Sequence, residues 1–332
     1  MQTKILKIDS LNLDEKIIIV AELIRKGELV AFPTETVYGL GADAFNPDAV
    51  KRIFVAKGRP VDNPLIVHIS SYEQLRWLVS EYGENASKLM KAFWPGPLTI
   101  IFKKNKKVPD IVTAGLNSVA VRMPSHPIAL ALIKESGNPI AAPSANLSGK
   151  PSPTKAEDVF HDLNGKIACI IDSGSSDIGL ESTVIDCTQK IPVLLRPGAI
   201  TREQIANAIG TIKIHDAVRN KIDAGTIEKM KIKSPGMKYR HYAPNARIIV
   251  VEGEKGKAEN KINELIKIYS GRKIKVIEIA DKNEGAREIY NIFRIADKDG
   301  IEIIVISGID EAGIGMALMN RIRKAASEII EV

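Results

Sequence analysis

Two short segments carry side chains that could act on a phosphorylated substrate. The first, AKGRPVDNPLIVHI, holds Lys57, Arg59, Asn63 and His68 between a predicted helix and a predicted strand, with two prolines stiffening it. Because a stiff segment holds its side chains in fixed directions, a lysine and an arginine two residues apart can face one anion. Each charge-assisted contact would contribute about 1.5–3 kcal/mol. From this segment alone, a basic surface loop is an equally good interpretation.

The second segment, IAAPSANLSGKPSPT, runs from a predicted strand into a loop rich in hydroxyl groups. Hydroxyl and amide groups beside strand ends commonly bind phosphate oxygens and hydrated magnesium. An alternative is a Pro/Ser turn that leads into the N-cap of the next helix, and we expect Thr154 to be that cap. The cap would still leave Ser144 and Asn146 for a ligand.

Three further polar residues stand at the ends of apolar strands. Arg122 ends SVAVR, Ser182 begins STVID and Arg196 ends VLLR. A charged residue at such a position is costly unless it is exposed or paired. Each alone is more often part of a structural salt bridge, but three of them beside the two loops favour one polar cleft.

The elements that position these residues follow from hydrophobic periodicity. Ile17, Ala21 and Ile24 lie on one face of a predicted helix, and a strand, LVAF, follows. The next segment, PTETVYGLGADAFNP, is so rich in Gly, Thr and Pro that we expect only loops there. Short strands then alternate irregularly with helices, which predicts a mixed α/β domain. Thr201 and Gln204 have capping-box spacing for a closing helix, and this first domain is predicted to span residues 1–209.

The remaining sequence changes character twice. Residues 210–246 show no sustained period and are predicted to be a linker and active-site lid. The lid is SPGMKYRHYAP, residues 234–244, which includes Tyr242 and has Pro235-Gly236 as hinge and Pro244 as stop. The alternative is that its side chains only hold the two domains together. Residues 247–332 alternate strands with amphipathic helices and end in a long helix. They predict a small parallel, doubly wound, Rossmann-like sheet.

Composition narrows the possible classes of function. The chain has 332 residues and 45% hydrophobic content without an apolar run long enough for a bilayer, so we expect a cytoplasmic protein. Its five histidines lack ligand-type spacing, which predicts no dedicated metal site. A net charge of +7 keeps an RNA-binding module as the alternative, although aromatic residues make up only 5% of the chain. There is no GxxxxGK[ST] motif, and neither GLGADA nor EGEKGK has a dinucleotide-binding context.

Seven motifs in a fixed order carry a resemblance to a known family: FPTETVYGLGADA, KGRPVDNPLIVHI, WPGPLT, VAVRMP, APSANLSG, ESTVID and RPG. The first domain resembles the YrdC/TsaC family of threonylcarbamoyl-AMP synthases. Because PGMKYRHYAP and a Rossmann-like domain ending GIGMALMNRIRKA follow, the chain is similar to the long, two-domain form.

The resemblance implies an activity and a set of site residues. The expected catalytic residues are Lys57, Arg59, Ser144 and Asn146. Those expected at threonine are Thr36, His68, Arg122, Ala142 and Ser182. Those expected at ATP are Arg59, Asn63, Ser118, Ser144, Ser152, Arg196 and Tyr242. The implied reaction joins threonine, bicarbonate and ATP into threonylcarbamoyl-AMP, with Mg²⁺ brought by ATP. A separate transferase would then modify an adenosine of tRNA, and the sequence leaves open whether this chain binds RNA directly.

Overall fold

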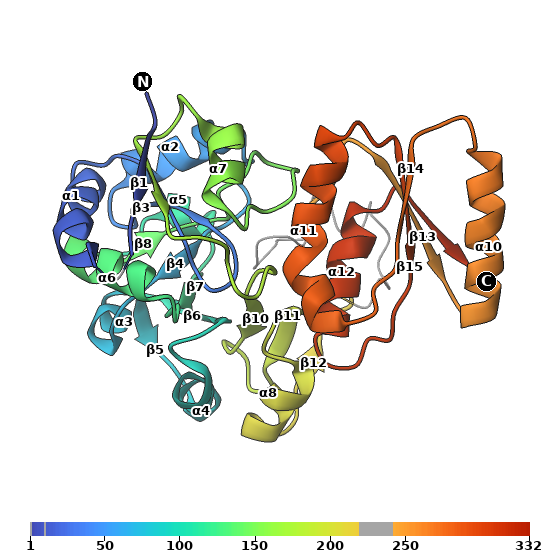
Figure 1. Ribbon diagram of the computed structural model, residues 1–332. Coiled ribbons are helices and arrows are strands. Elements are labelled where there is room, and N and C mark those ends of the chain that lie inside the picture. The colour runs from blue at the N-terminus through green and yellow to red at the C-terminus, as the bar shows by residue number, and fades with distance from the viewer. Residues whose placement is uncertain (1, 10, 219–241) are drawn as a thin grey trace. The chain divides into compact units, whose positions relative to one another are not determined.

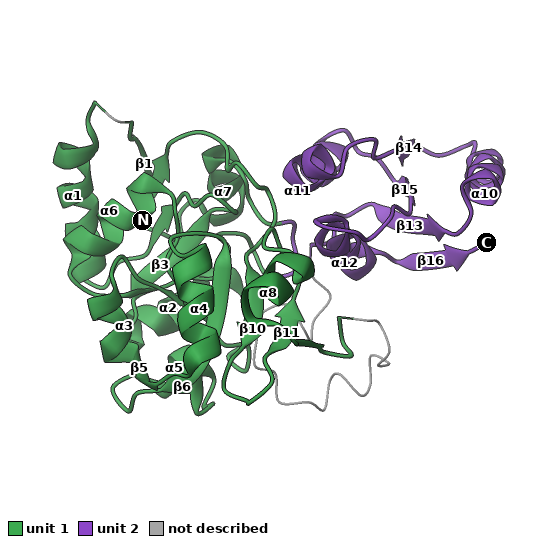
Figure 2. Cartoon of the chain, turned by 90° about the horizontal axis from the view of Figure 1, so that it is seen from below, with its two compact units in different colours: residues 1–148, 152–239 green, residues 149–151, 240–332 purple. Residues whose placement is uncertain are grey.

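The computed structural model describes residues 2–9, 11–218 and 242–332. Contacts divide the chain into two compact units, coloured in Figure 2. The first contains residues 1–148 and 152–239, and the second contains residues 149–151 and 240–332. Most of the predicted linker and lid, including Lys238, Tyr239, Arg240 and His241, lies outside the described residues. The predicted domain limits at residues 209 and 246 stay predictions.

The first unit is built on one large, twisted, mixed sheet, as the sequence predicted (Figure 1). The strand order is β1-β9-β2-β3-β8-β4-β7-β6-β10-β11-β12, with β5 beside β6. The strands are β1 (Lys4–Lys7), β2 (Val30–Phe32), β3 (Gly39–Asp43), β4 (Ile66–His68), β5 (Val79–Glu81), β6 (Leu98–Lys104), β7 (Ser118–Arg122), β8 (Ile140–Ala141), β9 (Cys169–Asp172), β10 (Thr183–Asp186), β11 (Val193–Arg196) and β12 (Lys213–Ile214).

Helices connect these strands and cover the sheet. They are α1 (Leu13–Arg25), α2 (Pro47–Lys57), α3 (Tyr72–Leu78), α4 (Glu84–Phe93), α5 (Asp110–Thr113), α6 (Pro127–Ser136), α7 (Ala156–Leu163) and α8 (Arg202–Ile209). The predicted capping box of α8 is confirmed, because the Gln204 backbone N–H donates to Thr201 Oγ1 at 3.2 Å and the Thr201 backbone N–H donates to Gln204 Oε1 at 2.8 Å. The expected cap at Thr154 is wrong, since α7 has Lys155 at its N-cap without a side-chain hydrogen bond.

Strand β3 contradicts the expectation that PTETVYGLGADAFNP forms only loops. It pairs antiparallel with β2 and with β8. Its glycines are required by close packing, because a Cβ on Gly41 would come within 2.8 Å of both Phe32 and Ile140. The glycine content that favoured a loop therefore serves close packing within a strand.

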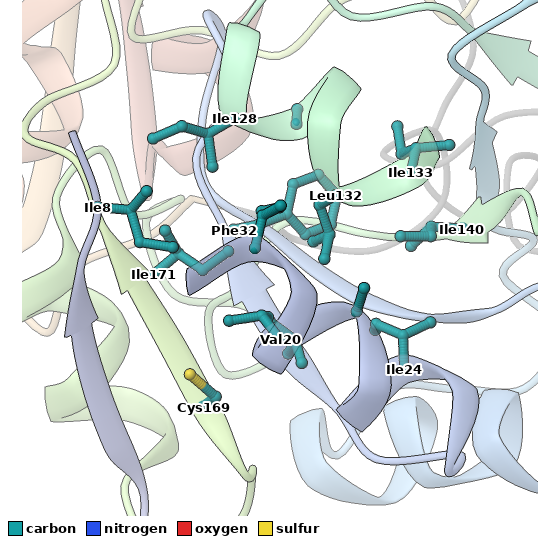
Figure 3. Close-up of a cluster of buried hydrophobic side chains, with 14 of the residues drawn as sticks. Ile8, Val20, Ile24, Phe32, Ile128, Leu132, Ile133, Ile140, Cys169 and Ile171 are labelled. Atoms are coloured by element: carbon teal, nitrogen blue, oxygen red, sulfur yellow. The ribbon is translucent and has the colours of Figure 1, made fainter. Parts of the chain in front are cut away.

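A core cluster of the first unit joins α1 and α6 to strands β2 and β9 (Figure 3). Val20 and Ile24 of α1 and Leu132 of α6 meet Phe32 and Ile171, all of them buried. Burying a side chain of this size stabilises the fold by about 1.5–3 kcal/mol. This packing supports strand β2, from whose end the segment containing Thr36 departs.

The second unit has a four-stranded sheet in the order β14-β15-β13-β16, with every pair parallel. Figure 1 shows α10 on one face of this sheet and α11 and α12 on the other. The elements are β13 (Arg247–Glu252), α10 (Lys255–Ile268), β14 (Ile274–Ile277), α11 (Lys282–Lys298), β15 (Ile303–Ser307), α12 (Gly315–Ala325) and β16 (Glu328–Glu331). The doubly wound arrangement was predicted, whereas β16 after the last helix was not.

Within the second unit, helix α11 contacts two segments that lie outside the parallel sheet, one at Tyr242 and one at residues 149–151. The ring of Tyr242 stacks on Tyr290 with centroids 5.4 Å apart, and the Arg321 guanidinium lies 5.6 Å from the Tyr242 ring. Arg294 Nη2 donates to the Pro151 carbonyl at 2.5 Å, and the Ala243 backbone N–H donates to the Gly149 carbonyl at 3.0 Å. Residues 149–151 therefore complete the packing of this unit.

Candidate functional site

The predicted polar residues include a row on one face of the central strands. His68 pairs with Arg122, which pairs in turn with Thr99. Because side chains alternate along a strand, these three residues lie on the same face as an apolar cluster two positions away. Its buried members are Ile66, Ile101, Ala120, Val184 and Leu195. This face of the sheet therefore changes from apolar to polar over two residues along each strand.

Arg122 is at the centre of the polar row and only 3% exposed. Its Nη1 donates to Thr36 Oγ1 at 2.8 Å, and its Nε donates to the Gly96 carbonyl at 3.3 Å. Its Nη2 lies 2.7 Å from Glu35 Oε1. Arg122 and Thr36, both predicted at the threonine site, are therefore in direct contact.

Glu35 did not appear among the predicted site residues. Its side chain is 7% exposed, and neither carboxylate oxygen has a donor in full hydrogen-bonding alignment among the described residues. Burial raises the pKa of the Glu35 carboxyl, but the Arg122 guanidinium outweighs this together with weaker contributions from the Glu35 and Ser125 main chain. The pKa is therefore held below its usual value, and Glu35 is an anion at neutral pH.

His68 is buried beside this pair, and its ring meets Phe32 edge-on at 6.0 Å. Burial and the neighbouring Arg122 charge lower the pKa of the imidazole to about 3. Its Nδ1 is buried without a hydrogen-bond partner among the described residues. The ring is thus a neutral, polar group that a ligand could satisfy.

Ser182 and Arg196 extend the row across β10 and β11. The Ser182 hydroxyl lies 2.7 Å from Thr99 Oγ1. Arg196 donates from Nε to the Ser182 carbonyl at 3.0 Å and from Nη2 to the Ser182 hydroxyl at 3.1 Å. This links a residue expected at ATP to one expected at threonine.

Lys57 ends α2 and is 2% exposed, so the alternative of a basic surface loop fails for it. Its Nζ donates to the Ser144 carbonyl at 2.6 Å and also to the Asn146 carbonyl. The Ser144 hydroxyl donates to Asn146 Oδ1 at 2.5 Å. Three of the four expected catalytic residues therefore form one connected group, with the ammonium fixing the backbone of the hydroxyl-rich loop.

Arg59 and Asn63 lie in the turn after α2. Arg59 is 9% exposed and donates from Nε to the Asn63 carbonyl at 3.2 Å and from Nη2 to the Pro64 carbonyl at 3.0 Å. Asn63 Oδ1 is buried without a hydrogen-bond partner among the described residues. On the other side of the hydroxyl-rich loop, the Ser152 hydroxyl donates to Glu181 Oε1 at 2.5 Å.

Three predicted residues have a different setting. Ser118 shares the face of Arg122 but starts the same strand, about 14 Å away at 3.4 Å per residue. It lines a 610 Å³ cavity with Lys103, Lys104 and neighbouring polar residues. Ala142 packs its methyl group in the core cluster with Phe32. Tyr242 belongs to the second unit, where its ring is stacked and 6% exposed.

The chemistry available is charge neutralisation and polar recognition. Within residues 2–9, 11–218 and 242–332, no three His, Cys, Asp or Glu side chains are grouped to hold a metal ion. None of the helices in these ranges has the length and hydropathy of a membrane span. Buried cations at Lys57, Arg59, Arg122 and Arg196 instead suit a substrate that carries several negative charges.

Sequence reasoning missed two buried carboxylates, Glu35 and Glu181. Each directly precedes a residue that was selected, Thr36 and Ser182 respectively. The sequence did offer a signal, because each carboxylate stands in a segment whose other residues are hydroxyl-bearing, glycine or apolar. A carboxylate in such a segment is rarely buried unless it is paired, so a buried cation nearby could have been predicted.

Comparison with known proteins gives two family matches. Residues 22–198 match the Sua5/YciO/YrdC family described as telomere recombination, and residues 200–327 match the threonylcarbamoyl-AMP synthase C-terminal domain. The chain is 54% identical to threonylcarbamoyl-AMP synthase of Pyrococcus abyssi, covering 96% of both chains. It is 49% identical to the Bacillus subtilis enzyme of that name, covering 94% of this chain and 93% of that one.

A solved structure gives the same result over the whole chain. The crystal structure of P. abyssi Sua5 complexed with L-threonine superposes with a TM-score of 0.92 at 51% identity and covers 100% of both chains. A shorter relative, threonylcarbamoyl-AMP synthase of Vibrio parahaemolyticus, is 36% identical over 54% of this chain and 97% of its own. The match thus spans just over half of this chain and nearly all of that relative.

Proposed function

Because the chain belongs to the threonylcarbamoyl-AMP synthase family, we propose that it converts L-threonine, bicarbonate and ATP into threonylcarbamoyl-AMP and pyrophosphate. The observation that carries the proposal is the pairing of two polar groups in one unit. One, around Arg122, offers buried recognition of a small zwitterion. The other, around Lys57, offers cations and hydroxyls for phosphate.

The reaction needs no covalent enzyme intermediate. Bicarbonate and the threonine amine form a carbamate, whose oxygen attacks the α-phosphorus of ATP while the bond to pyrophosphate breaks. Negative charge shifts onto the bridging and leaving oxygens, so cations already in position lower the barrier. Lys57 and Arg59 supply this charge, and Arg196 adds to it beside Ser182.

Lys57 has a second role in this proposal. By donating to the Ser144 and Asn146 carbonyls, it fixes the loop that presents their side chains. Groups fixed before the reaction avoid the cost of reorganising during it. Ser144 and Asn146 are therefore assigned to hold phosphate oxygens.

At the threonine end, Arg122 is the carboxylate anchor and neutral His68 is a polar neighbour. Thr36 keeps the Arg122 fork in place through its hydroxyl, which is itself 2.8 Å from Thr34 Oγ1. Ser182 contacts Arg196, which is expected at ATP, and Thr99, which is paired with Arg122 on the next strand. It therefore lies between the residues assigned to L-threonine and those assigned to the nucleotide. A fitted pocket of this kind should discriminate against serine by about 1–3 kcal/mol, the value of one methyl group.

The expected companions are part of the same proposal. Mg²⁺ would arrive with ATP and screen its phosphate charge, consistent with a donor set of hydroxyls and amides beside buried cations. A separate transferase would consume the labile adenylate to modify an adenosine of tRNA, in the cytoplasm. Direct RNA binding by this chain is the competing proposal, supported by its net charge of +7.

The deciding experiment incubates the purified chain with ATP, threonine, bicarbonate and Mg²⁺. We expect pyrophosphate and threonylcarbamoyl-AMP, detected by coupled assay and mass spectrometry, and neither product when threonine or bicarbonate is omitted. Tight RNA binding without either product would favour the competing proposal.

A further inference from the structure

Glu35 has an arrangement that the roles assigned so far do not use. Its carboxylate is buried and charged, and its contacts with Arg122 and with the main chain of Glu35 and Ser125 are all out of full hydrogen-bonding alignment. A charge-assisted contact is normally the strongest available to a buried carboxylate, so a carboxylate whose contacts are all unaligned can accept a further, better aligned bond. The group that supplies it must be a donor, and a cation fits best.

Two neighbours of Glu35, Arg122 and His68, also have buried polar atoms without an aligned hydrogen bond. Arg122 Nη2 is a buried donor without an aligned acceptor, although it lies 2.7 Å from Glu35 Oε1. His68 Nδ1 is a buried ring nitrogen without a partner. Buried polar groups are rarely left unsatisfied, and here three of them meet beside one another.

An α-amino acid supplies the complement of this set. Its carboxylate needs donors of the Arg122 type, and its ammonium, about one bond further along, needs acceptors. With the ligand bound, the charges would alternate as guanidinium, carboxylate of Glu35, ammonium and carboxylate of the ligand. Every neighbouring pair would then be attractive, which offsets the desolvation that buried charges incur.

We propose that Glu35 binds the α-ammonium group of threonine and thereby orients the substrate nitrogen. The inference rests on the proposed function and adds a residue to it. Glu35 is a positioning residue for the nitrogen rather than its base, because a carboxylate whose pKa lies below its usual value is a poor acceptor for an ammonium proton. When the ammonium and bicarbonate form the carbamate, one water and one further proton are released, and the proton passes to bulk solvent.

A purely structural role makes a different prediction. If Glu35 served only to hold Arg122, removing its charge would damage recognition of the ligand carboxylate, not of the ammonium. The two roles separate with two analogues of threonine. Threoninol keeps the ammonium and lacks the carboxylate, and the α-hydroxy analogue keeps the carboxylate and carries a hydroxyl in place of the ammonium.

The test measures calorimetric dissociation constants of the full chain for threonine and both analogues, without ATP. We expect wild type to favour threonine over the α-hydroxy analogue by roughly 10- to 100-fold, the worth of one charge-assisted contact. Glu35→Gln should lose that preference and keep the preference for threonine over threoninol. Arg122→Lys should do the reverse, and Glu22→Gln, which changes a half-exposed carboxylate on α1, should change neither.

Equal binding of threonine and the α-hydroxy analogue by wild type would overturn the inference without any variant. So would a Glu35→Gln chain that keeps the ammonium preference, or one that loses only the carboxylate preference. If Glu35→Gln fails to fold, Glu35→Asp keeps the charge with a shorter side chain and should weaken threonine more than the α-hydroxy analogue. Threonine binding with these preferences but without pyrophosphate formation would overturn the proposed function and leave the role of Glu35 standing.

Discussion

Glu35 and Arg122 form a buried ion pair with 2.7 Å between Oε1 and Nη2, and their side chains are 7% and 4% exposed. Burying two charges costs several kcal/mol of solvation, which their attraction can offset only while both are present. The pair therefore couples the stability of the fold to the arrangement of the proposed threonine site.

Removing one partner should destabilise the chain far more than removing both. Either Glu35→Gln or Arg122→Met leaves a buried charge unpaired and is expected to lower the free energy of unfolding by about 3–5 kcal/mol. The double variant should lose clearly less than the sum, as measured by urea unfolding. Additive losses would show that the two charges do not interact.

Arg122→Lys should raise the KM for threonine far more than the KM for ATP. A lysine is a point charge on a flexible side chain and cannot replace the planar fork that Thr36 and Gly96 hold in place. Steady-state kinetics with each substrate varied in turn measure the two constants. A parallel rise in both, or no rise, would remove Arg122 as the carboxylate anchor.

Lys57→Met should abolish pyrophosphate release and also weaken the fold. Because the ammonium is buried and bonded to two carbonyls, its loss leaves those acceptors unsatisfied at about 1–3 kcal/mol each. Lys51→Met, an exposed change on the same helix, is the matched control and should leave turnover and melting unchanged. Normal turnover by Lys57→Met would refute its catalytic assignment.

Acid should destabilise the chain partly through His68. In the unfolded chain its imidazole titrates near 6.5, whereas in the folded chain burial and Arg122 hold the pKa at about 3. Between these two pH values the unfolded state binds more protons than the folded state. The free energy of unfolding therefore decreases by about 1.4 kcal/mol for each unit by which the pH is lowered below 6. Burial also lowers the pKa of His126, so the contribution of His68 between pH 5 and 6.5 is the difference between wild type and a His68 variant.

The measurement for His68 compares the urea-unfolding free energy of wild type and His68→Gln across that window. The wild-type curve should fall more steeply, and parallel curves would show that His68 is not held neutral.

Tyr242→Ala should lower the stability of the second unit by about 3–5 kcal/mol, since a buried, stacked ring is lost. Tyr242→Phe keeps the ring and should stay close to wild type. Thermal unfolding followed by calorimetry measures both. Weaker ATP binding by Tyr242→Ala with unchanged unfolding would instead support the expected contact with the nucleotide.

The sequence identified polar residues that the structure brings together, but it did not reveal the contacts between them. Lys57, Ser144 and Asn146 were identified from two motifs far apart in the chain, and the structure joins them. Glu35 was missed because its burial depends on Arg122, a partner on a distant strand that no local pattern reveals. The same limit applies to the fold, since residues 39–43 become a strand only because Phe32 and Ile140 pack closely against Gly41.

The segment Gly149–Pro151 interrupts the first unit in sequence, and its packing partner is synthesised much later. Arg294, which donates to the Pro151 carbonyl, follows it by 143 residues, about 7–30 s of translation at ordinary ribosome speeds. The loop between Ser144 and Ser152 must therefore wait for its final contacts after most of the first unit has left the ribosome. The order of synthesis makes this loop, which holds two of the proposed catalytic residues, one of the last parts of the nascent chain to reach its native arrangement.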